Sequence, residues 1–297
     1  MKKLTYFSTF TGIGGLDIGL EEIGAKCVGY SEIKQGSIDI YSRHYPDHQN
    51  FGDITKIRFE LLPDFDVLTG GFPCQAFSLA GSRKGFSDRR GQMIFYLHDM
   101  IVAKKPKLVV LENVKGILNH NDGKTFDSVV RLLMGAGYHV KVLLLNAINY
   151  GVPQNRERVI FIATLDKFDG GALVVLDNTK RFRDIREIDG EFKMIPQSDF
   201  NYKKIEQLRQ FTFELIGGYD RVGTCTTQFG CGEKAVPQDD WYRYLTPLEC
   251  ERLQGFPDGY TEGVKPLKRY FALGNAVNCN MSRYLFTNYL SKFIKGL

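Results

Sequence analysis

The sequence predicts an α/β protein, with a mostly parallel sheet followed by a second, smaller domain. Short runs rich in Val, Ile, Leu and aromatic residues alternate with helix-like stretches over the first 165 residues. Polar and glycine-rich motifs follow several of these runs directly, as ligand-binding residues do at the carboxyl ends of parallel strands. Between residues 166 and 245 the periodic pattern is lost, which indicates a separate module.

Six strands are expected in the first part of the chain, with helices between several of them. The strands are predicted at Leu4–Thr9, Lys26–Ser31, Phe65–Thr69, Lys107–Glu112, Val140–Asn146 and Arg158–Ala163. The helices are predicted at Leu16–Ile23, Ser37–His44, Gln92–Val102 and Thr125–Met134. Near the end, Thr246 is expected to cap a helix, with Pro247 in the first helical position and Glu249 in the third. Residues Asn275–Ile294 are predicted to form one long helix.

The composition is that of a soluble globular protein, with 43% hydrophobic and 25% charged residues among 297. The longest apolar runs fall far short of the ~18–20 residues that a membrane span needs, and the N-terminus lacks the apolar core of a signal peptide. Six cysteines are too few for a disulfide scaffold, and neither a Cys-x-x-Cys pair nor a histidine pair with metal-ligand spacing is present. We therefore expect a cytoplasmic protein without a metal.

The net charge of +5 permits a polyanionic partner without requiring one. Seven Lys and Arg residues lie between positions 83 and 107 against two acids, and six lie between 265 and 297 against none. Solvated helix faces explain either cluster as readily as a nucleic acid does.

Three groups of residues lie at the ends of predicted strands and carry chemistry. The turn Phe10–Leu16 is glycine-rich, which suits either a purely structural turn or the close approach of a nucleoside to the backbone. Two acids favour the nucleoside, because Glu32 ends the second strand and could accept both ribose hydroxyls, and Asp53 could contact an adenine edge.

The second group surrounds Cys74, in a loop after the third strand. A lone cysteine is most often a small buried hydrophobe. Here two glycines, a proline and the polar Gln75 and Ser78 surround it, which favours a nucleophile.

The third group is Glu112, which closes an apolar strand, and the segment Gln154–Arg158, which carries two arginines. A buried acid is costly without a task or a partner, and two guanidinium groups can hold an anionic or carbonyl-bearing substrate. The alternative for the arginines is an internal Glu–Arg ion pair.

Together these motifs resemble those of the DNA cytosine-5 methyltransferases. The resemblance rests on the glycine-rich turn at 10–16, Gly-Phe-Pro-Cys-Gln at 71–75, Glu-Asn-Val at 112–114, Gln-Asn-Arg-Glu-Arg at 154–158, the segment Leu245–Pro257 and Gly-Asn-Ala-Val at 274–277. It covers nearly the whole chain apart from residues 166–240. It implies the Rossmann-like fold of S-adenosylmethionine-dependent methyltransferases, and transfer of a methyl group to carbon 5 of a flipped-out cytosine in a specific duplex DNA sequence.

The resemblance also implies a role for each matching residue. Cys74 is the nucleophile that adds to carbon 6 of cytosine, Glu112 holds ring nitrogen 3 and the amino group, and Arg158 grips the base carbonyl and steadies Glu112, with Arg156 grouped beside it. The implied cofactor contacts are Phe10, Gly12, Gly14, Gly15, Glu32, Ile33, Asp53, Ile54, Gly71, Pro73, Met93, Asn275 and Ala276. The implied DNA contacts are Gln75, Ser78, Arg83, Lys84, Arg89, Arg90, Thr224, Thr226, Thr227 and Gln228.

Two domains are implied, a catalytic one at 1–165 plus 263–297 and a target-recognition one at 166–262. In the latter, 224–230 resembles the family's Thr-Leu recognition segment, with Cys225 where Leu is usual. Gln228 could pair with adenine or stabilise its own loop. Residues 74–93 resemble the mobile loop that closes over the extruded base.

Three positions depart from the family pattern. Ser8 stands where an Asp is usual, which puts one cofactor contact in doubt, and Ala276 lacks the hydroxyl of the usual Ser. At position 80, where some members insert a side chain into the vacated stack, this chain has Ala.

Other functions remain open at this point. A branch of the family methylates tRNA, and a catalytically idle DNA-binding relative is a further alternative. A Rossmann dehydrogenase fits poorly, because the turn lacks a full Gly-x-Gly-x-x-Gly. For the methyltransferase we expect double-stranded DNA as partner, no membrane and a monomer. A restriction-modification role with a separately encoded endonuclease, phage self-protection and gene control all stay open.

Overall fold

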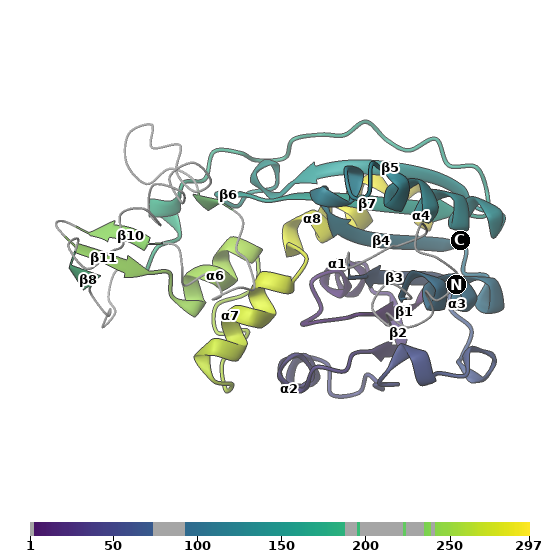
Figure 1. The fold of residues 1–297 in the computed structure, drawn as a ribbon, viewed down its shortest axis with the longest axis horizontal. Helices are drawn as coiled ribbons and strands as arrows, with labels where there is room; N and C mark the ends of the chain where they lie inside the picture. The colour runs from purple at the N-terminus through teal and green to yellow at the C-terminus, as the bar shows by residue number, and fades with distance from the viewer. Residues whose placement is uncertain (1–2, 74–92, 188–194, 197–221, 224–234, 239–240) are drawn as a thin grey trace.

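The computed structural model describes residues 3–73, 93–187, 195–196, 222–223, 235–238 and 241–297. Its centre is a six-stranded sheet with the strand order β2-β1-β3-β4-β7-β5 (Figure 1). The strands are β1 (Thr5–Thr9), β2 (Lys26–Ser31), β3 (Val67–Gly71), β4 (Leu108–Val114), β5 (His139–Asn146) and β7 (Glu157–Thr164). Because β7 runs antiparallel to both neighbours and the other pairs are parallel, the predicted mostly parallel sheet is confirmed.

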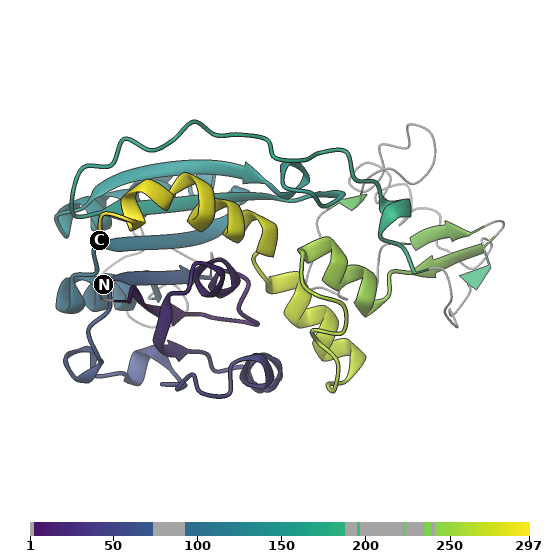
Figure 2. The same cartoon turned by 180° about the vertical axis from the view of Figure 1, so that it is seen from behind.

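Helices cover both faces of this sheet, and each face has its own hydrophobic core. Along β4, Val109 and Leu111 pack with residues of α3 (Met93–Lys104) and α4 (Lys124–Gly135). Leu108 and Val110 point to the other face. That face is covered by α1 (Asp17–Glu22) and the C-terminal helices, which Figure 2 shows in yellow. Burial on both faces explains why β4 begins with the uninterrupted apolar run Leu108–Leu111. α2 (Gln35–His44) follows β2.

The predicted long helix at 275–294 is wrong. The chain forms α7 (Pro266–Asn275), an extended link at Ala276, α8 (Cys279–Tyr284), a π-helical turn (Leu285–Tyr289) and α9 (Ser291–Ile294). The break has a local cause, since the Asn278 side chain accepts from the N–H groups of Asn280 and Met281 and so starts a new helix. It also has a distant cause, because the buried Arg156 holds the backbone carbonyls of Gly274 and Ala276.

The region after β7 first runs along the large sheet. The Val174 N–H donates to the Tyr284 hydroxyl, and the Leu176 N–H donates to the Asn149 carbonyl. Further along, β8 (Ile195–Pro196), β10 (Ala235–Gln238) and β11 (Trp241–Tyr244) form a small antiparallel sheet, and β9 (Val222–Gly223) pairs with β6 (Gln154–Asn155). The boundary of the second domain at 166 and 262 stays a prediction.

The helix predicted after Thr246 is confirmed as α6 (Pro247–Gln254). The Thr246 hydroxyl accepts from the Glu249 N–H, while the Glu249 carboxylate accepts from the Thr246 N–H. This capping box ties the end of the small sheet to a third core, which α6 and α7 share with Ile13 of the glycine-rich turn.

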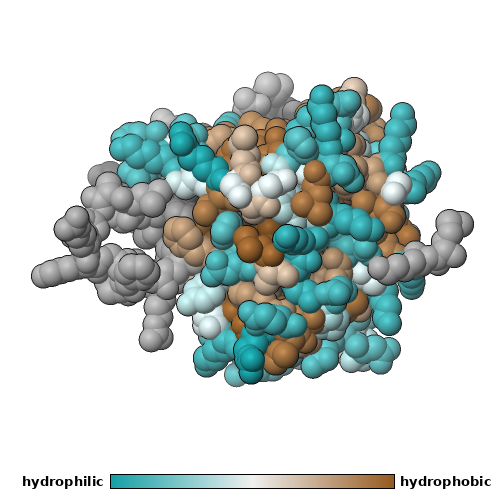
Figure 3. Space-filling model, turned by 90° about the vertical axis from the view of Figure 1, so that its right-hand side faces the viewer, coloured by the Kyte–Doolittle hydropathy of each residue, from teal (hydrophilic) through white to brown (hydrophobic). Residues whose placement is uncertain are grey.

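Hydrophilic and hydrophobic residues are interspersed on the face that Figure 3 shows. In the part of the chain that the structure describes, no helix is long and apolar enough to cross a membrane.

Candidate active site

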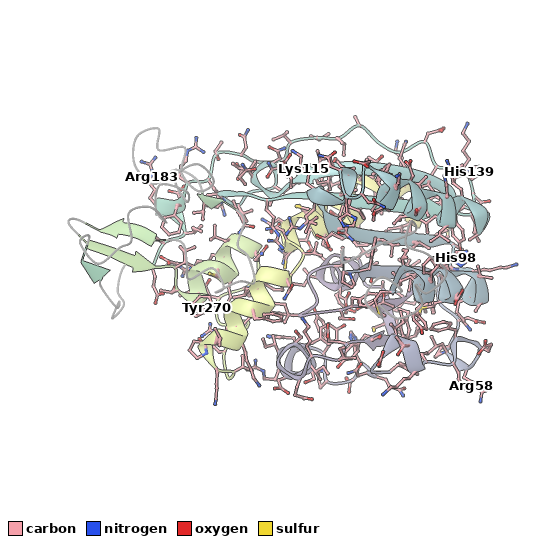
Figure 4. All side chains as sticks on the ribbon, in the orientation of Figure 1. Arg58, His98, Lys115, His139, Arg183 and Tyr270 are labelled. Atoms are coloured by element: carbon pink, nitrogen blue, oxygen red, sulfur yellow. The ribbon has the colours of Figure 1, made fainter. Side chains whose placement is uncertain are left out.

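The carboxyl ends of the parallel strands meet at one edge of the sheet. β4 ends beside Lys115, and β5, which runs parallel to β4, begins at His139; Figure 4 labels the two at opposite ends of the sheet. Tyr270 of α7 lies on the Lys115 side in the same view. The predicted motifs therefore face the region of α7.

The glycine-rich turn after β1 has a left-handed backbone at three positions. The φ angle is +49° at Phe10, +59° at Gly12 and +87° at Gly14. The Gly14 N–H donates to the Thr11 carbonyl at 3.0 Å, which closes a tight turn. A side chain at Gly14 would be doubly disfavoured, because its Cβ would also lie 2.9 Å from the Tyr41 ring.

Gly15 packs directly against the segment at 274–277. A Cβ on Gly15 would lie 2.2 Å from the Val277 carbonyl oxygen. The Arg156 guanidinium, 1% exposed, donates to the carbonyls of Gly274 at 3.0 Å and Ala276 at 2.7 Å. Arg156 therefore positions this backbone segment, in which Ala276 is buried and extended.

Replacing Gly15 by alanine is expected to destabilise the fold by about 1–3 kcal/mol, because the methyl group requires the Val277 backbone to move. The matched control is Gly135→Ala at the end of α4, where a Cβ meets nothing within 4 Å. Urea unfolding measures both variants. Equal stability of the two would contradict the close packing of the turn.

The two acids assigned to the nucleoside both bind nearby backbone N–H groups. The Glu32 carboxylate accepts from Gly12, Ile33 and Lys34, each at 2.8 Å. The Asp53 carboxylate accepts from the N–H and hydroxyl of Thr55. Glu32 is therefore tied to the turn itself.

The neighbouring apolar residues differ in exposure. The side chain of Ile33 is 67% exposed, while Ile54 is buried at 3%. Asn275 is exposed and donates to the Phe271 carbonyl. Met93 is half-buried at the start of α3.

Glu112 and Arg158 form a buried ion pair. Glu112 lies opposite Ile160 in the β4–β7 register, and Arg158, two residues from Ile160, is on the same face of the sheet. Arg158 Nε lies 2.8 Å from Glu112 Oε1, and the side chains are 9% and 10% exposed. Burial lowers the pKa of Arg158, and the Glu112 charge opposes that change.

The surroundings of Glu112 and Arg158 indicate what the pair can bind. A Cβ on Gly71, the β3 partner of Glu112, would lie 3.3 Å from Glu112 Oε2. The Glu157 carboxylate pairs with Lys115 at 2.8 Å, so the carboxylate that pairs with Arg158 is that of Glu112. The Glu157 backbone carbonyl accepts from Arg158 Nη1 at 2.7 Å. The pair presents an anion and a cation together, as recognition of a polar ring with donors and acceptors requires.

Asn113, the residue after Glu112, is a candidate site residue to which the sequence assigns no role. Its side chain is 2% exposed and donates to the Phe72 carbonyl at 2.9 Å. Asn113 thereby fixes the chain that leads to Pro73 and Cys74. The signal for this role is an amide directly after the acid that closes a strand.

A second unassigned residue is Asp17, buried beneath the glycine-rich turn. Ser8 donates to Asp17 Oδ1 at 2.7 Å, and the Tyr41 hydroxyl donates to Oδ2 at 2.6 Å. Burial raises the pKa of Asp17 to about 6, although both hydrogen bonds act in the opposite direction. The signal for this residue is an acid at the start of an otherwise apolar helix.

The raised pKa of Asp17 predicts a pH dependence of stability. Because the folded state binds this proton more tightly than the unfolded chain, the stabilisation is complete below about pH 4 and is lost as the pH rises through about 6. The loss amounts to about 3 kcal/mol. Asp17→Asn stays neutral, so urea unfolding should show its stability rising relative to the original protein from pH 4 to 7. A constant difference between the two proteins would contradict the assignment.

Several predicted residues lie outside the described part of the chain. They are Cys74, Gln75, Ser78, Arg83, Lys84, Arg89, Arg90, Thr224, Thr226, Thr227 and Gln228. Position 80 and the Cys225 departure lie there as well.

Comparison with known proteins gives one consistent result. The model of the C-5 cytosine-specific DNA methylase family matches residues 4–214 and 175–291. The type II methyltransferase M.DsaV of Dactylococcopsis salina is 32% identical over 305 residues, covering 98% of this chain and 87% of the relative. The type II methyltransferase M.HhaI of Haemophilus parahaemolyticus is 31% identical over 307 residues, covering 96% and 94%.

Solved structures agree on the fold. The methyltransferase EhMeth of Entamoeba histolytica superposes with a TM-score of 0.77 at 20% identity, covering 99% of each chain. The α/β fold of the methyltransferases, expected from the sequence, is therefore confirmed.

Proposed function

The chain belongs to the C-5 cytosine-specific DNA methylase family, and from this premise we propose that it methylates carbon 5 of a cytosine within a specific duplex DNA sequence. The observation that carries the proposal is the buried Glu112–Arg158 pair. The pair lies at the carboxyl edge, beside Gly71, which precedes Cys74 by three positions in the sequence.

The glycine-rich turn fits S-adenosylmethionine as the cofactor. Gly12 and Gly14 have positive φ angles and no side chains, so a ligand can approach the backbone closely. The Glu32 carboxylate is held at this turn by the Gly12 N–H, and the exposed Ile33 offers an apolar surface to an adenine. When bound, this cofactor supplies an electrophilic methyl group on a positively charged sulfur. The residues proposed to hold it are Phe10, Gly12, Gly14, Gly15, Glu32, Ile33, Asp53, Ile54, Gly71, Pro73, Met93, Asn275 and Ala276.

Cys74 is the proposed nucleophile. Its thiolate forms a bond to carbon 6 of the cytosine, and the electrons of the 5,6 double bond move to carbon 5. Carbon 5 then takes the methyl group, whose bond to sulfur breaks and leaves the electron pair on the sulfur of S-adenosylhomocysteine. A base then takes the carbon-5 proton, the electron pair of that C–H bond restores the double bond, and Cys74 leaves as thiolate. Glu112 holds ring nitrogen 3 and the amino group during addition, and Arg158 binds the base carbonyl. Arg156 acts as a positioning residue.

Recognition of the duplex is assigned to two segments. Gln75, Ser78 and the arginines and lysine between 83 and 90 contact the backbone, where each phosphate contact strengthens the salt dependence of binding. Residues 224–228 read bases in the major groove, within a recognition domain at 166–262. The target base is flipped out at a cost of a few kcal/mol.

The wider setting follows the named relatives. We propose a cytoplasmic monomer that acts on double-stranded DNA in a restriction-modification system, with a separately encoded endonuclease as its counterpart. In the described residues no group of three or more His, Cys, Asp or Glu side chains could hold a metal ion.

Bisulfite sequencing of a plasmid tests the proposal. The plasmid is grown in a host without cytosine methylation that expresses either the original protein or Cys74→Ser. We expect methylation confined to one short motif with the original protein and none with the variant.

Methyl transfer to duplex DNA and to tRNA is compared with purified protein in the same buffer. Saturating activity on tRNA alone would overturn the proposal. Unmethylated DNA from a soluble, folded protein that binds S-adenosylhomocysteine would likewise contradict it.

A further inference from the structure

Asp17 is the deepest carboxylate near the glycine-rich turn. Its side chain is 1% exposed and accepts from Ser8 and from Tyr41. No ion pair joins Asp17 to a lysine or arginine within the residues that the structure describes. Hydrogen bonds from two hydroxyl groups therefore stabilise the negative charge of the buried Asp17 carboxylate.

One of those donors leads to the turn. The Thr11 hydroxyl donates to Ser8 Oγ at 3.0 Å, and Ser8 Oγ donates to Asp17 at 2.7 Å. The Thr11 carbonyl in turn accepts from the Gly14 N–H, and the next residue, Gly12, donates to Glu32. The hydroxyl chain Thr11–Ser8–Asp17 therefore fastens the turn to α1 from below.

The groups around Asp17 are polar but mostly neutral near pH 6. Burial raises the pKa of each tyrosine and of the cysteine facing it from β1, β2, α2 and the segment after α6. They are Tyr6, Cys27, Tyr41, Tyr45 and Tyr260. Burial lowers the pKa of His48, whose Nδ1 lies 3.0 Å from the Tyr41 hydroxyl. Glu21, on the same helix as Asp17, disfavours its ionised form.

We propose that Asp17 positions the glycine-rich turn through Ser8 and Thr11, and that cofactor binding favours the ionised form of Asp17 and so releases a proton. This inference rests on the proposed function, because it requires S-adenosylmethionine to bind at the turn.

The direction of the effect follows from hydrogen-bond chemistry. A carboxylate can only accept, so it fixes Ser8 as its donor and leaves Ser8 Oγ to accept from Thr11. A protonated Asp17 carries a hydroxyl that can itself donate to Ser8 or Tyr41. The donor and acceptor roles along Thr11, Ser8 and Asp17 are then no longer fixed.

Calorimetry of S-adenosylhomocysteine binding in buffers of different ionisation enthalpy tests the coupling. Near pH 6 the original protein should release a fraction of a proton, and Asp17→Asn should release less. Affinity should rise between pH 5 and 7.5, by up to about tenfold when binding lowers the Asp17 pKa from about 6 to well below 5. The affinity of Asp17→Asn should stay flat across this range, at the low-pH value of the original protein.

If Asp17 only stabilised the fold, the affinity for S-adenosylhomocysteine would not fall as the pH is lowered from 7.5 to 5. Protonation of Asp17 itself favours the folded state, so its titration does not lower affinity at pH 5 through loss of fold.

Two further variants test the route through Ser8. Ser8→Ala cuts the chain while leaving Asp17 in place, and should lower affinity with reduced proton release. The exchange Ser8→Asp with Asp17→Ser reverses donor and acceptor across the same hydrogen bond, and should recover affinity relative to Asp17→Ser alone.

The possible failures are distinguishable. An original protein that binds no S-adenosylhomocysteine at any pH would overturn the proposed function. Binding with equal proton release in the original protein and Asp17→Asn would overturn this inference alone.

Discussion

Replacing Cys74 by serine is expected to lower the rate of methyl transfer by about four orders of magnitude or more, while duplex affinity is retained. A serine hydroxyl is almost wholly protonated at neutral pH, so it cannot add to carbon 6 as a thiolate does. The measurement is single-turnover methyl transfer to a duplex with one target site, beside a binding isotherm for the same duplex.

Covalent trapping gives an independent readout. A target cytosine with fluorine at carbon 5 has no proton to lose after methylation, so the adduct should persist on a denaturing gel. The original protein should form this adduct, and Cys74→Ser should form none. Cys250→Ala, at a buried cysteine of α6, is the matched control and should keep its activity. A Cys74→Ser protein with the original rate would end the assignment of the nucleophile.

The sheet could be predicted from the sequence because its signals are local. The strand Lys26–Ser31 was placed at its observed bounds, and the run at 107–112 was found because β4 is buried on both faces. Local signals could not show that the predicted helix at 275–294 is interrupted. Its break depends on Arg156, more than a hundred residues away, holding the carbonyls of Gly274 and Ala276.

In the candidate site, too, some residues could be predicted from the sequence, whereas others depend on contacts between distant parts of the chain. Glu112 and Arg158 were grouped because the family resemblance implies that Arg158 steadies Glu112, and the structure places the two side chains in an ion pair. The role of Asn113 depends on the Phe72 carbonyl of a neighbouring strand end, and that of Asp17 on Ser8 and Tyr41. Such contacts between distant residues are set by packing, so the sequence signals at Asn113 and Asp17 mark the two residues but not their partners.

Replacing Glu112 by glutamine is expected to slow methyl transfer by about 10²–10⁴-fold, the range of a positioned acid or base. Glutamine keeps an oxygen that can accept from Arg158 Nε, so the buried pair retains a hydrogen bond. It loses the negative charge that balances both Arg158 and the charge developing on the cytosine ring during addition of Cys74. The loss should therefore appear in the single-turnover rate, with little change in the affinity for S-adenosylhomocysteine.

The matched control for Glu112→Gln is the same substitution at Glu157, on the adjacent strand. Its carboxylate pairs with Lys115 and its side chain is 34% exposed, so solvent screens the pair. Glu157→Gln should change the rate by less than about threefold. If Glu112→Gln and Glu157→Gln lost activity equally, the loss would come from the total negative charge at this edge of the sheet and not from the buried Glu112–Arg158 pair. A large defect confined to Glu112→Gln places the required charge at the buried pair, because the two variants differ in burial and partner but not in chemistry.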